Sequence, residues 1–179
     1  MPKIETNILF LHIPKTAGSS FRKAAEDYFT TPNTHYDYGE KSTETHPKIL
    51  ELDYKNQDRF SAGSYIMNHA QFLSGHINYH KYAPFFMAKN IITFLREPGQ
   101  QIRSHFEHYV RHHNYKETFE TFIQDKRFCN LQSRLLKGLP TSAYGFIGIT
   151  EEYSTSIELI NTYYKIDIKA LSLNKNESK

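Results

Sequence analysis

The sequence predicts an α/β fold in which helices flank a central, mainly parallel β-sheet. Short apolar runs lie at 8–12, 91–95 and 145–149, and each is followed by residues whose apolar positions repeat at helical spacing. Strands that alternate with helices are typical of parallel sheets, because each crossover places a helix on a face of the sheet. The length of 179 residues suits one domain.

The first strand is predicted at 8–12, where an apolar run ends at a turn that contains proline and glycine. A helix should follow from Ser19 onward, since apolar residues recur there at helical spacing: Phe21, Ala24, Ala25 and Tyr28. Residues 30–64 are polar and irregular, and the one element predicted within them is a short helix that begins at Pro47.

The run at 91–95 is typical of a strand that is buried on both faces. Pro98 then occupies a favoured first helical position. An apolar stripe on the following helix is formed by Ile102, Phe106 and Tyr109. Further helices are predicted near 116–127 and 129–137, the second ended by a glycine and a proline.

The last strand is predicted at 145–149. Thr150 is expected to cap the next helix, and the acidic pair Glu151 and Glu152 suits the positive end of that helix's dipole. The buried face of this helix should be formed by Tyr153, Ile157, Ile160 and Tyr164.

The composition excludes several classes of protein. The net charge of +3 is too small to demand a nucleic-acid partner. The single Cys129 rules out a disulfide framework and a multi-cysteine zinc site. Near the start of the chain, the longest apolar stretch is 8–11, which is too short for a signal peptide or a membrane span. We therefore expect a soluble, cytoplasmic protein.

The segment 11–21 predicts a strand, a turn and the start of a helix, which is a favourable place for a phosphate. Lys15 adds a mobile positive charge, and Gly18 allows a ligand to approach the backbone closely. Hydroxyl donors are added by Thr16, Ser19 and Ser20. The Walker pattern G-x-x-x-x-G-K-[ST] is absent. On these residues alone, an ordinary capped helix start explains the segment equally well.

A second strand–turn–helix begins at Arg96, which should lie at the carboxyl end of a buried strand, where open α/β sheets bind ligands. Its planar guanidinium suits a phosphate. Ser104 lies about two helical turns further on and could donate to the same anion. The alternative is that Arg96 only pairs with Glu97 or another carboxylate.

His76 follows a glycine and precedes a short apolar stretch, which places it at a predicted strand end. A neutral imidazole there could accept a proton from an acceptor hydroxyl. Taken alone, a single histidine more often has a structural role. The nearby Tyr79, Tyr82, Phe85 and Phe86 could stack on a substrate ring, although core packing is the more common use of aromatic side chains.

Four histidines lie close together in the helix after Pro98, and their spacing formally allows a metal site. They are His105, His108, His112 and His113. No carboxylate or cysteine clearly completes a ligand set, and a solvated face beside Arg111 explains them equally well. No metal site is predicted.

Together these segments resemble the sulfotransferase superfamily that uses 3′-phosphoadenosine 5′-phosphosulfate (PAPS). The resemblance is to the carbohydrate branch that includes heparan sulfate 2-O-sulfotransferase and its bacterial relatives. Residues 12–21 are similar to the family's 5′-phosphosulfate loop, and 95–104 to its 3′-phosphate motif. Residues 75–79 resemble the segment that holds the family's catalytic histidine. Residues 130–134 and 148–156 match the pattern of the family further along the chain.

The resemblance implies a three-layer, P-loop-like fold and transfer of a sulfuryl group to a hydroxyl. Lys15 would stabilise the charge that grows on the 5′-phosphate as it leaves. The loop would add the donors of Thr16, Ala17, Gly18, Ser19 and Ser20. Arg96 and Ser104 would hold the 3′-phosphate, and His76 would be the general base on the acceptor. The donor is then PAPS, no metal is required, and the acceptor is a glycan or a small molecule.

The sequence departs from the family's pattern at several positions. Glu97 replaces the usual aspartate, and Gln100 and Gln101 stand where relatives often carry Glu-Arg. Ser74 stands in place of a second histidine. The family's chain continues past a nucleotide-covering loop, whereas this one ends soon after Leu173, so we expect one domain over 1–179 that lacks that C-terminal segment.

Two other functions remain open at this point. One is a nucleotide-binding or interaction protein that keeps the fold without turnover, as the short C-terminus and the missing basic residue would suggest. The other is a small-molecule kinase on the same fold, against which the absent Walker motif argues. The sequence predicts neither the acceptor nor the oligomeric state.

Overall fold

The structure is a computed structural model, and it describes residues 7–171 of the chain. Its strands are β1 (Ile8–Leu11), β2 (Thr34–Asp37), β3 (Phe72–Gly75), β4 (Ile91–Leu95) and β5 (Phe146–Ile149). Its α-helices are α1 (Gly18–Phe29), α2 (Pro47–Ile49), α3 (Arg59–His69), α4 (Pro98–His112), α5 (Phe119–Gln124), α6 (Leu131–Leu135) and α7 (Tyr153–Tyr164). The expected beginning of a nucleotide-covering loop at 173–179 lies outside the described residues.

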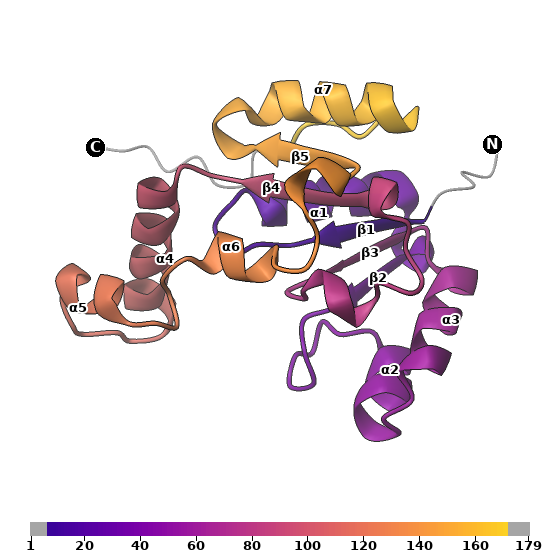
Figure 1. Ribbon diagram of the computed structural model, residues 1–179, viewed down its shortest axis with the longest axis horizontal. Helices are drawn as coiled ribbons and strands as arrows, with labels where there is room; N and C mark the ends of the chain where they lie inside the picture. The colour runs from indigo at the N-terminus through magenta and orange to yellow at the C-terminus, as the bar shows by residue number, and fades with distance from the viewer. Residues whose placement is uncertain (1–6, 172–179) are drawn as a thin grey trace.

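The five strands form one sheet in the order β2-β3-β1-β4-β5, and every pair is parallel (Figure 1). The chain starts with β1 in the middle, adds β2 and β3 on one side, and then adds β4 and β5 on the other. The direction of strand addition therefore reverses beside β1. The predicted P-loop-like α/β fold with a parallel sheet is confirmed.

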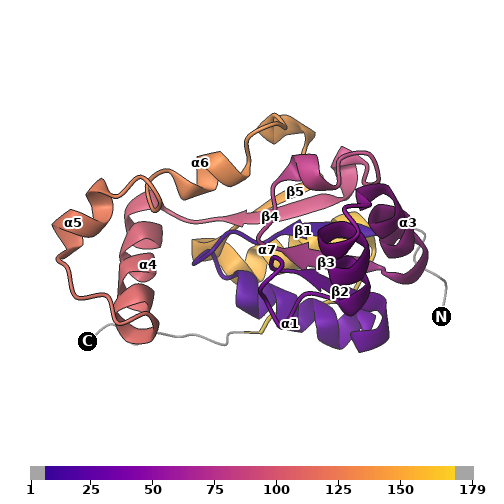
Figure 2. The ribbon, with the colours of Figure 1, turned by 90° about the horizontal axis from the view of Figure 1, so that it is seen from below.

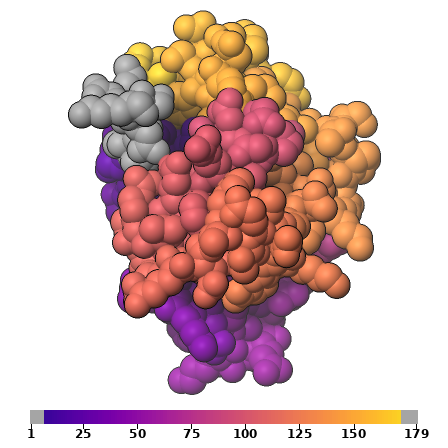
Figure 3. Space-filling view, turned by 90° about the vertical axis from the view of Figure 1, so that its left-hand side faces the viewer, coloured from indigo at the N-terminus to yellow at the C-terminus, as the bar shows by residue number. Residues whose placement is uncertain are grey.

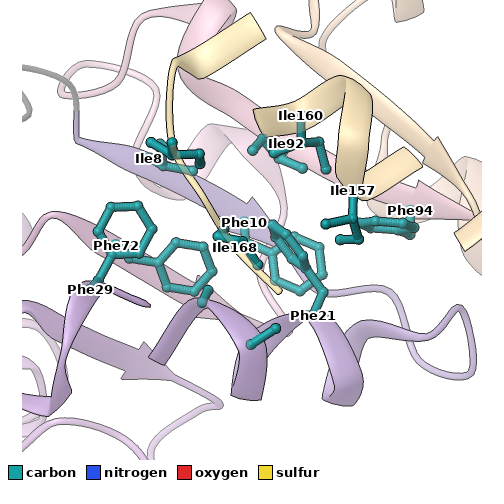
Figure 4. Close-up of a cluster of buried hydrophobic side chains, with 13 residues drawn as sticks. Ile8, Phe10, Phe21, Phe29, Phe72, Ile92, Phe94, Ile157, Ile160 and Ile168 are labelled. Atoms are coloured by element: carbon teal, nitrogen blue, oxygen red, sulfur yellow. The ribbon is translucent and has the colours of Figure 1, made fainter. Parts of the chain in front are cut away.

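Helices α1 and α7 cover one face of the sheet and share a core with it. Figure 4 shows Phe10 of β1, Phe21 of α1 and Ile157 of α7 within this core. The rings of Phe10 and Phe21 meet edge to face with their centres 4.8 Å apart. Both side chains are fully buried, and burial of a phenylalanine stabilises a fold by about 2 kcal/mol.

The second face of the sheet is covered by α2, α3 and segments 77–86 and 135–144. Tyr82 and Phe86 are buried in this core, and Tyr79 and Phe85 pack against it. The structure therefore shows core packing for these aromatic residues, and stacking on a substrate stays untested. With helices on both faces, the predicted three-layer arrangement is confirmed.

Helices α4 and α5 lie beyond the carboxyl edge of the sheet, at the opposite end of the molecule from α3 (Figures 1 and 2). On the face shown in Figure 3, α4 and the α5–α6 segment lie in the centre, with α7 above them. Both helices expected near 116–127 and 129–137 are present in shorter form, as α5 and α6. None of the helices in the part of the chain that the structure describes is long and apolar enough to cross a membrane.

The sequence prediction was wrong in two places. Residues 30–64 contain β2 and the start of α3 in addition to the predicted short helix at Pro47. Thr150 does not cap α7, because its hydroxyl donates to the carbonyl of Leu95 at 2.9 Å and α7 begins only at Tyr153. The predicted buried face of α7 is correct, since Ile157 and Ile160 are buried in the core.

A buried histidine in β2 makes stability depend on pH. The ring of His35 stacks on that of His46 at 3.9 Å between centres, and its side chain is only 4% exposed. Burial lowers the pKa of His35 from 6.5 to about 4, with further lowering by His46 and His69. Between these two values the unfolded chain binds a proton that the folded chain does not, so stability falls as the pH falls.

From pH 7 to pH 5, this one site should lower the free energy of unfolding by about 2 kcal/mol. Urea unfolding at both values measures the change. His35→Phe removes the titrating group but keeps a ring against His46, so the variant should lose about 2 kcal/mol less than the wild type over the same interval. An equal loss in variant and wild type would show that His35 is not the group responsible.

Candidate active site

The first residue after each strand lies at one edge of the sheet, because all the strands are parallel and end together. These residues are Tyr38, His76, His12, Arg96 and Thr150, in the order of the strands across the sheet. Open α/β sheets bind ligands at this edge, at the point where the strand order reverses. Here that point lies beside β1, between the turns that follow β1 and β4.

The turn after β1 has the geometry of an anion-binding loop. Lys15 has φ 67° and Ala17 has φ 62°, so two non-glycine residues adopt the left-handed conformation on either side of Thr16. Alternation of this kind directs successive backbone N–H groups into one concavity, called a nest. Each left-handed residue costs about 1–2 kcal/mol, which indicates that the surrounding structure holds the loop in this shape.

Side chains from the loop and from α4 hold this conformation. The Thr16 hydroxyl is buried and donates to the carbonyl of Ile13 at 2.9 Å. Gln101 of α4 is also buried, and its amide donates to the carbonyl of Pro14 at 3.0 Å. The Thr16 hydroxyl proton, expected to be available to a ligand, is thus used within the loop. Gln101, noted in the sequence only as a departure, ties the loop to α4.

Lys15 is partly buried where the loop meets α4. Burial lowers the pKa of its ammonium group, and the positive charges of Arg111 and Arg96 lower it further, while Glu107 opposes the change. The nearby cations mean that this position has a positive potential, which favours an anionic ligand.

The turn after β4 holds Arg96 against the loop. The side-chain amide of Gln132 accepts from the Arg96 N–H and donates to the Arg96 carbonyl, both at 2.9 Å. The Arg96 guanidinium Nη1 donates to the carbonyl of Lys15 at 3.4 Å, and its buried Nε has no partner among residues 7–171. The two predicted anion-binding turns are therefore in contact.

Arg96 does not form an ion pair with Glu97 within the described residues. The Glu97 carboxylate instead caps α4, accepting from the N–H groups of Gly99 at 2.9 Å and Gln100 at 2.6 Å. The Glu97 N–H donates to Glu151 at 3.0 Å, which links the turn to the start of α7. Arg96 is thus left to face the site while Glu97 fixes the helix behind it.

Ser104 lies in the middle of α4 and is partly exposed. Its side chain makes no hydrogen bond among residues 7–171, and the structure shows no contact between it and Arg96. Its assignment to the 3′-phosphate stays a prediction. The same holds for Ser19, which is exposed in the first turn of α1.

His76 lies directly after β3, as predicted, and its ring meets those of His12 and Tyr38 with centres 4.8 and 4.7 Å away. The residue as a whole is exposed. Desolvation by its neighbours lowers the pKa of His76 to about 4, Arg22 lowers it further and Glu44 opposes the change. The imidazole is therefore neutral at pH 7 and able to accept a proton.

Four residues to which the sequence pattern assigned no role surround His76. Arg22 of α1 pairs with Glu44 at 2.8 Å and lies over the ring of Tyr38, 5.3 Å from its centre. His12 is 7% exposed, and its Nδ1 lies 2.7 Å from the Tyr38 hydroxyl. Only His12 lay within a segment already singled out; the others come from regions with no recognisable motif.

Comparison with a solved structure supports the fold. The mouse sulfotransferase SULT7A1, solved in complex with PAP, matches with a TM-score of 0.57 at 17% identity, over 92% of this chain and 60% of that one. This chain has the fold of a sulfotransferase. A sulfotransferase from Alicyclobacillus acidocaldarius also matches, with a TM-score of 0.48 at 12% identity over 94% of this chain and 87% of the other. No family model and no curated protein sequence matches the chain.

This chain spans 60% of the length of the mouse sulfotransferase. Within the shared fold, a groove of about 870 Å³ lies between α4, α5 and α6. Its lining includes Gln101 and Gln132, the same side chains that hold the loop and Arg96. The groove therefore adjoins both turns and provides room for a ligand beside them.

The three histidines of α4 and His113, which directly follows the helix, separate into two environments. His105 is buried, and its ring meets those of Tyr109, Phe122 and Phe128. His108, His112 and His113 gather at the end of the helix, where the last two are exposed. Among residues 7–171, no three histidine, cysteine or acidic side chains are arranged to hold a metal ion.

Proposed function

We propose that this protein transfers a sulfuryl group from PAPS to a hydroxyl, with a carbohydrate as the acceptor class that the sequence resemblance favours. The observation that carries the proposal is the contact between the two turns, in which Arg96 Nη1 donates to the carbonyl of Lys15. PAPS carries negative charge at both its 5′ and its 3′ position, so it needs two anion-binding groups at one edge of the sheet. The mouse protein of the same fold was solved with PAP, the product that keeps both phosphates.

The residues present fit an anionic nucleotide. The nest around Thr16 offers backbone N–H groups, and Lys15 adds a positive charge beside them. Arg96 keeps a buried Nε without a partner among the described residues, so a bound phosphate would satisfy it. We assign the 5′-phosphosulfate to the loop and the 3′-phosphate to Arg96, with Ser104 as the second donor expected there.

The reaction needs a base on one side of the sulfur and a stabilised leaving group on the other. The acceptor oxygen would form a bond to sulfur as its proton passes to His76, and the bond from sulfur to the 5′-phosphate oxygen would break. The charge that develops on that oxygen would lie at the loop, beside Lys15 and the positive end of α1. As in phosphoryl transfer, positioning and electrostatics then supply most of the catalysis.

Calorimetric titration of the protein with PAP, 5′-AMP and ATP tests the proposal, together with transfer from PAPS to a panel of glycans and phenols. We expect PAP to bind at least tenfold more tightly than 5′-AMP, since only PAP engages Arg96; such a difference corresponds to about 1.4 kcal/mol. Equal affinity for the two nucleotides would overturn the 3′-phosphate assignment. Binding without transfer to any acceptor would favour a non-catalytic protein, and phosphate transfer from ATP would favour a kinase.

Arg96→Ala should weaken PAP binding about 10- to 100-fold, the usual value of a hydrogen bond to a charged group. The affinity for 5′-AMP should change little, because it lacks the 3′-phosphate. Arg127→Ala is the matched control, since that arginine is exposed and, among residues 7–171, forms an ion pair with Asp125 alone and lies over the ring of Phe128. An equal loss of affinity for PAP and 5′-AMP in Arg96→Ala would mean that Arg96 supports the loop but does not bind the 3′-phosphate.

His76→Ala should lower kcat for transfer about 100-fold or more, the range of a lost general base, while the Kd for PAP stays within about threefold. The pH profile gives a second readout. Because the folded-state pKa of His76 is about 4, the base stays deprotonated as the pH falls below 6.5. We therefore expect kcat/KM to show no decline centred near pH 6.5, and unchanged turnover in His76→Ala would remove this residue from the role.

A further inference from the structure

His12 is a buried polar side chain at the carboxyl end of β1. It follows the strand directly, and its N–H donates to the carbonyl of Gly75 at 2.9 Å, which ties the end of β1 to the residue before His76. The side chain is 7% exposed, and its ring stacks on Phe10. A buried imidazole in this place should have a defined orientation and defined partners for both nitrogens.

One edge of the His12 ring faces the beginning of α1. A Cβ placed on Gly18, the first residue of α1, would overlap the Cδ2 and Nε2 atoms of His12. Gly18 has no side chain, and His12 occupies the space that this leaves. The sequence had suggested that a ligand would approach the backbone there. This contact places Nε2 beside the backbone of the anion-binding loop.

The opposite nitrogen belongs to a buried chain of hydroxyl groups. Nδ1 of His12 lies 2.7 Å from the Tyr38 hydroxyl, which lies 3.1 Å from the Ser74 hydroxyl. Ser74 is fully buried. Within residues 7–171 its hydroxyl has no hydrogen-bond partner besides Tyr38, so it must donate to Tyr38 if its proton is to be satisfied.

This order of donation determines the tautomer of His12. The two contacts themselves allow either direction, but with Ser74 as the donor to Tyr38 the Tyr38 proton is directed to His12 Nδ1, which is then the acceptor nitrogen. The remaining proton of a neutral imidazole is on Nε2. Burial, followed by the charges of His76, Arg22 and Lys15, lowers the pKa of His12 well below its usual value, so the ring is neutral at pH 7.

We propose that His12 is an anion-binding residue whose Nε2–H donates to the 5′ phosphate or sulfuryl group held by the loop, and that Tyr38 and Ser74 are positioning residues that fix its tautomer. The inference rests on the proposed function and names one more binding group in that site. A neutral donor at this point stabilises negative charge without adding a cation beside His76, so it does not oppose protonation of that base.

The tautomer can be measured without any ligand. A long-range proton–nitrogen NMR spectrum of the wild type distinguishes Nε2–H from Nδ1–H, and the spectrum of His12→Gln identifies the His12 signals by their loss. We expect Nε2–H in the wild type and a mixture of tautomers in Tyr38→Phe, which removes the proton donated to Nδ1. Tyr28→Phe is the control, since Tyr28 lies at the far end of α1. A wild-type His12 protonated on Nδ1 would overturn the inference.

Titration with PAP tests the donated hydrogen bond. His12→Leu fills the space without a donor and should weaken binding about 10-fold or more. His12→Gln, whose amide N–H can occupy the position of Nε2–H, should stay within about threefold of the wild type, and Tyr38→Phe should lie between them. Near-ultraviolet circular dichroism checks that each variant is folded. If His12→Leu does not fold, the PAP affinity of Tyr38→Phe and the NMR spectrum of the wild type test the inference instead.

The outcomes separate the two proposals. A wild type that does not bind PAP would overturn the proposed function and this inference with it. A wild type that binds PAP, with equal affinity in His12→Leu, would overturn the inference alone. Loss of binding in His12→Gln as severe as in His12→Leu would show that the ring has only a packing role against Gly18.

Discussion

Replacing Lys15 with alanine should reduce the rate of sulfuryl transfer about 100- to 1000-fold, the usual effect of removing one group that stabilises charge in a transition state. Lys15 belongs to the loop where the leaving 5′-phosphate would lie, and it is partly buried there, so water would not replace its charge fully. Single-turnover measurement with PAPS gives the rate. Lys23→Ala, a variant of an exposed lysine on α1, should leave the rate unchanged.

A glycine variant separates the chemical role of Lys15 from a structural one. Lys15 has φ 67°, which is unfavourable for any residue with a Cβ. Lys15→Gly should therefore be more stable than Lys15→Ala by up to about 1 kcal/mol, while both lose transfer. Transfer that recovers in the glycine variant would mean that the loop conformation, and not the ammonium group, is what the reaction requires.

The sequence predicts the position of a residue best where one short segment contains the whole pattern that identifies the position. Each of the two turns proposed to bind an anion lies between an apolar strand and an amphipathic helix, so local pattern alone places Lys15 and Arg96 at strand ends. A parallel sheet then brings strand ends to one edge. The contact between these turns follows from the neighbouring positions of β1 and β4, which local pattern does not contain.

Strand β2 could not be found because its buried residues are polar. His35 is buried by stacking on His46, and Asp37 is buried within hydrogen bonds and an ion pair. Neither residue has the apolar character on which strand prediction depends. Without β2, the position of Tyr38 beside His12 was also hidden, although the two are only 26 residues apart.

The side chains that hold the backbone of the site in place could not be predicted, for a related reason. Gln132 holds the backbone of Arg96 across 36 residues, and Thr150 holds the carbonyl of Leu95 across 55. Glutamine and threonine are common on solvated surfaces, so nothing in the local sequence distinguishes these from others. The resemblance to sulfotransferases marked both segments, but their physical role appears only once the sheet is assembled.

Lys81→Met should lower the free energy of unfolding by about 3–5 kcal/mol, the cost of breaking a buried ion pair from one side. Lys81 Nζ lies 2.6 Å from Asp37 and 2.8 Å from Asp53, and both carboxylates are almost fully buried. Tyr82 and Tyr54 also donate to Asp37, each at 2.8 Å. Without Lys81, two carboxylates would remain close together, with Arg59 at 3.1 Å from Asp53 as their remaining ion pair among the described residues.

The pH dependence of the free energy of unfolding of Lys81→Met identifies the cause of its lower stability. Loss of the ammonium group should raise the carboxyl pKa in the folded variant, so the folded state would take up a proton as the pH falls. The deficit relative to the wild type should therefore shrink from pH 7.5 to pH 5.5, as urea unfolding at each pH would show. Lys23→Met, which breaks exposed pairs with Asp27 and Glu26, should cost less than about 1 kcal/mol at both values. A deficit that stays constant with pH would point to the lost contact between the Lys81 ammonium group and the ring of Tyr54. Because Asp37 directly precedes Tyr38, a confirmed deficit would connect the stability of this end of β2 to the group that orients His12.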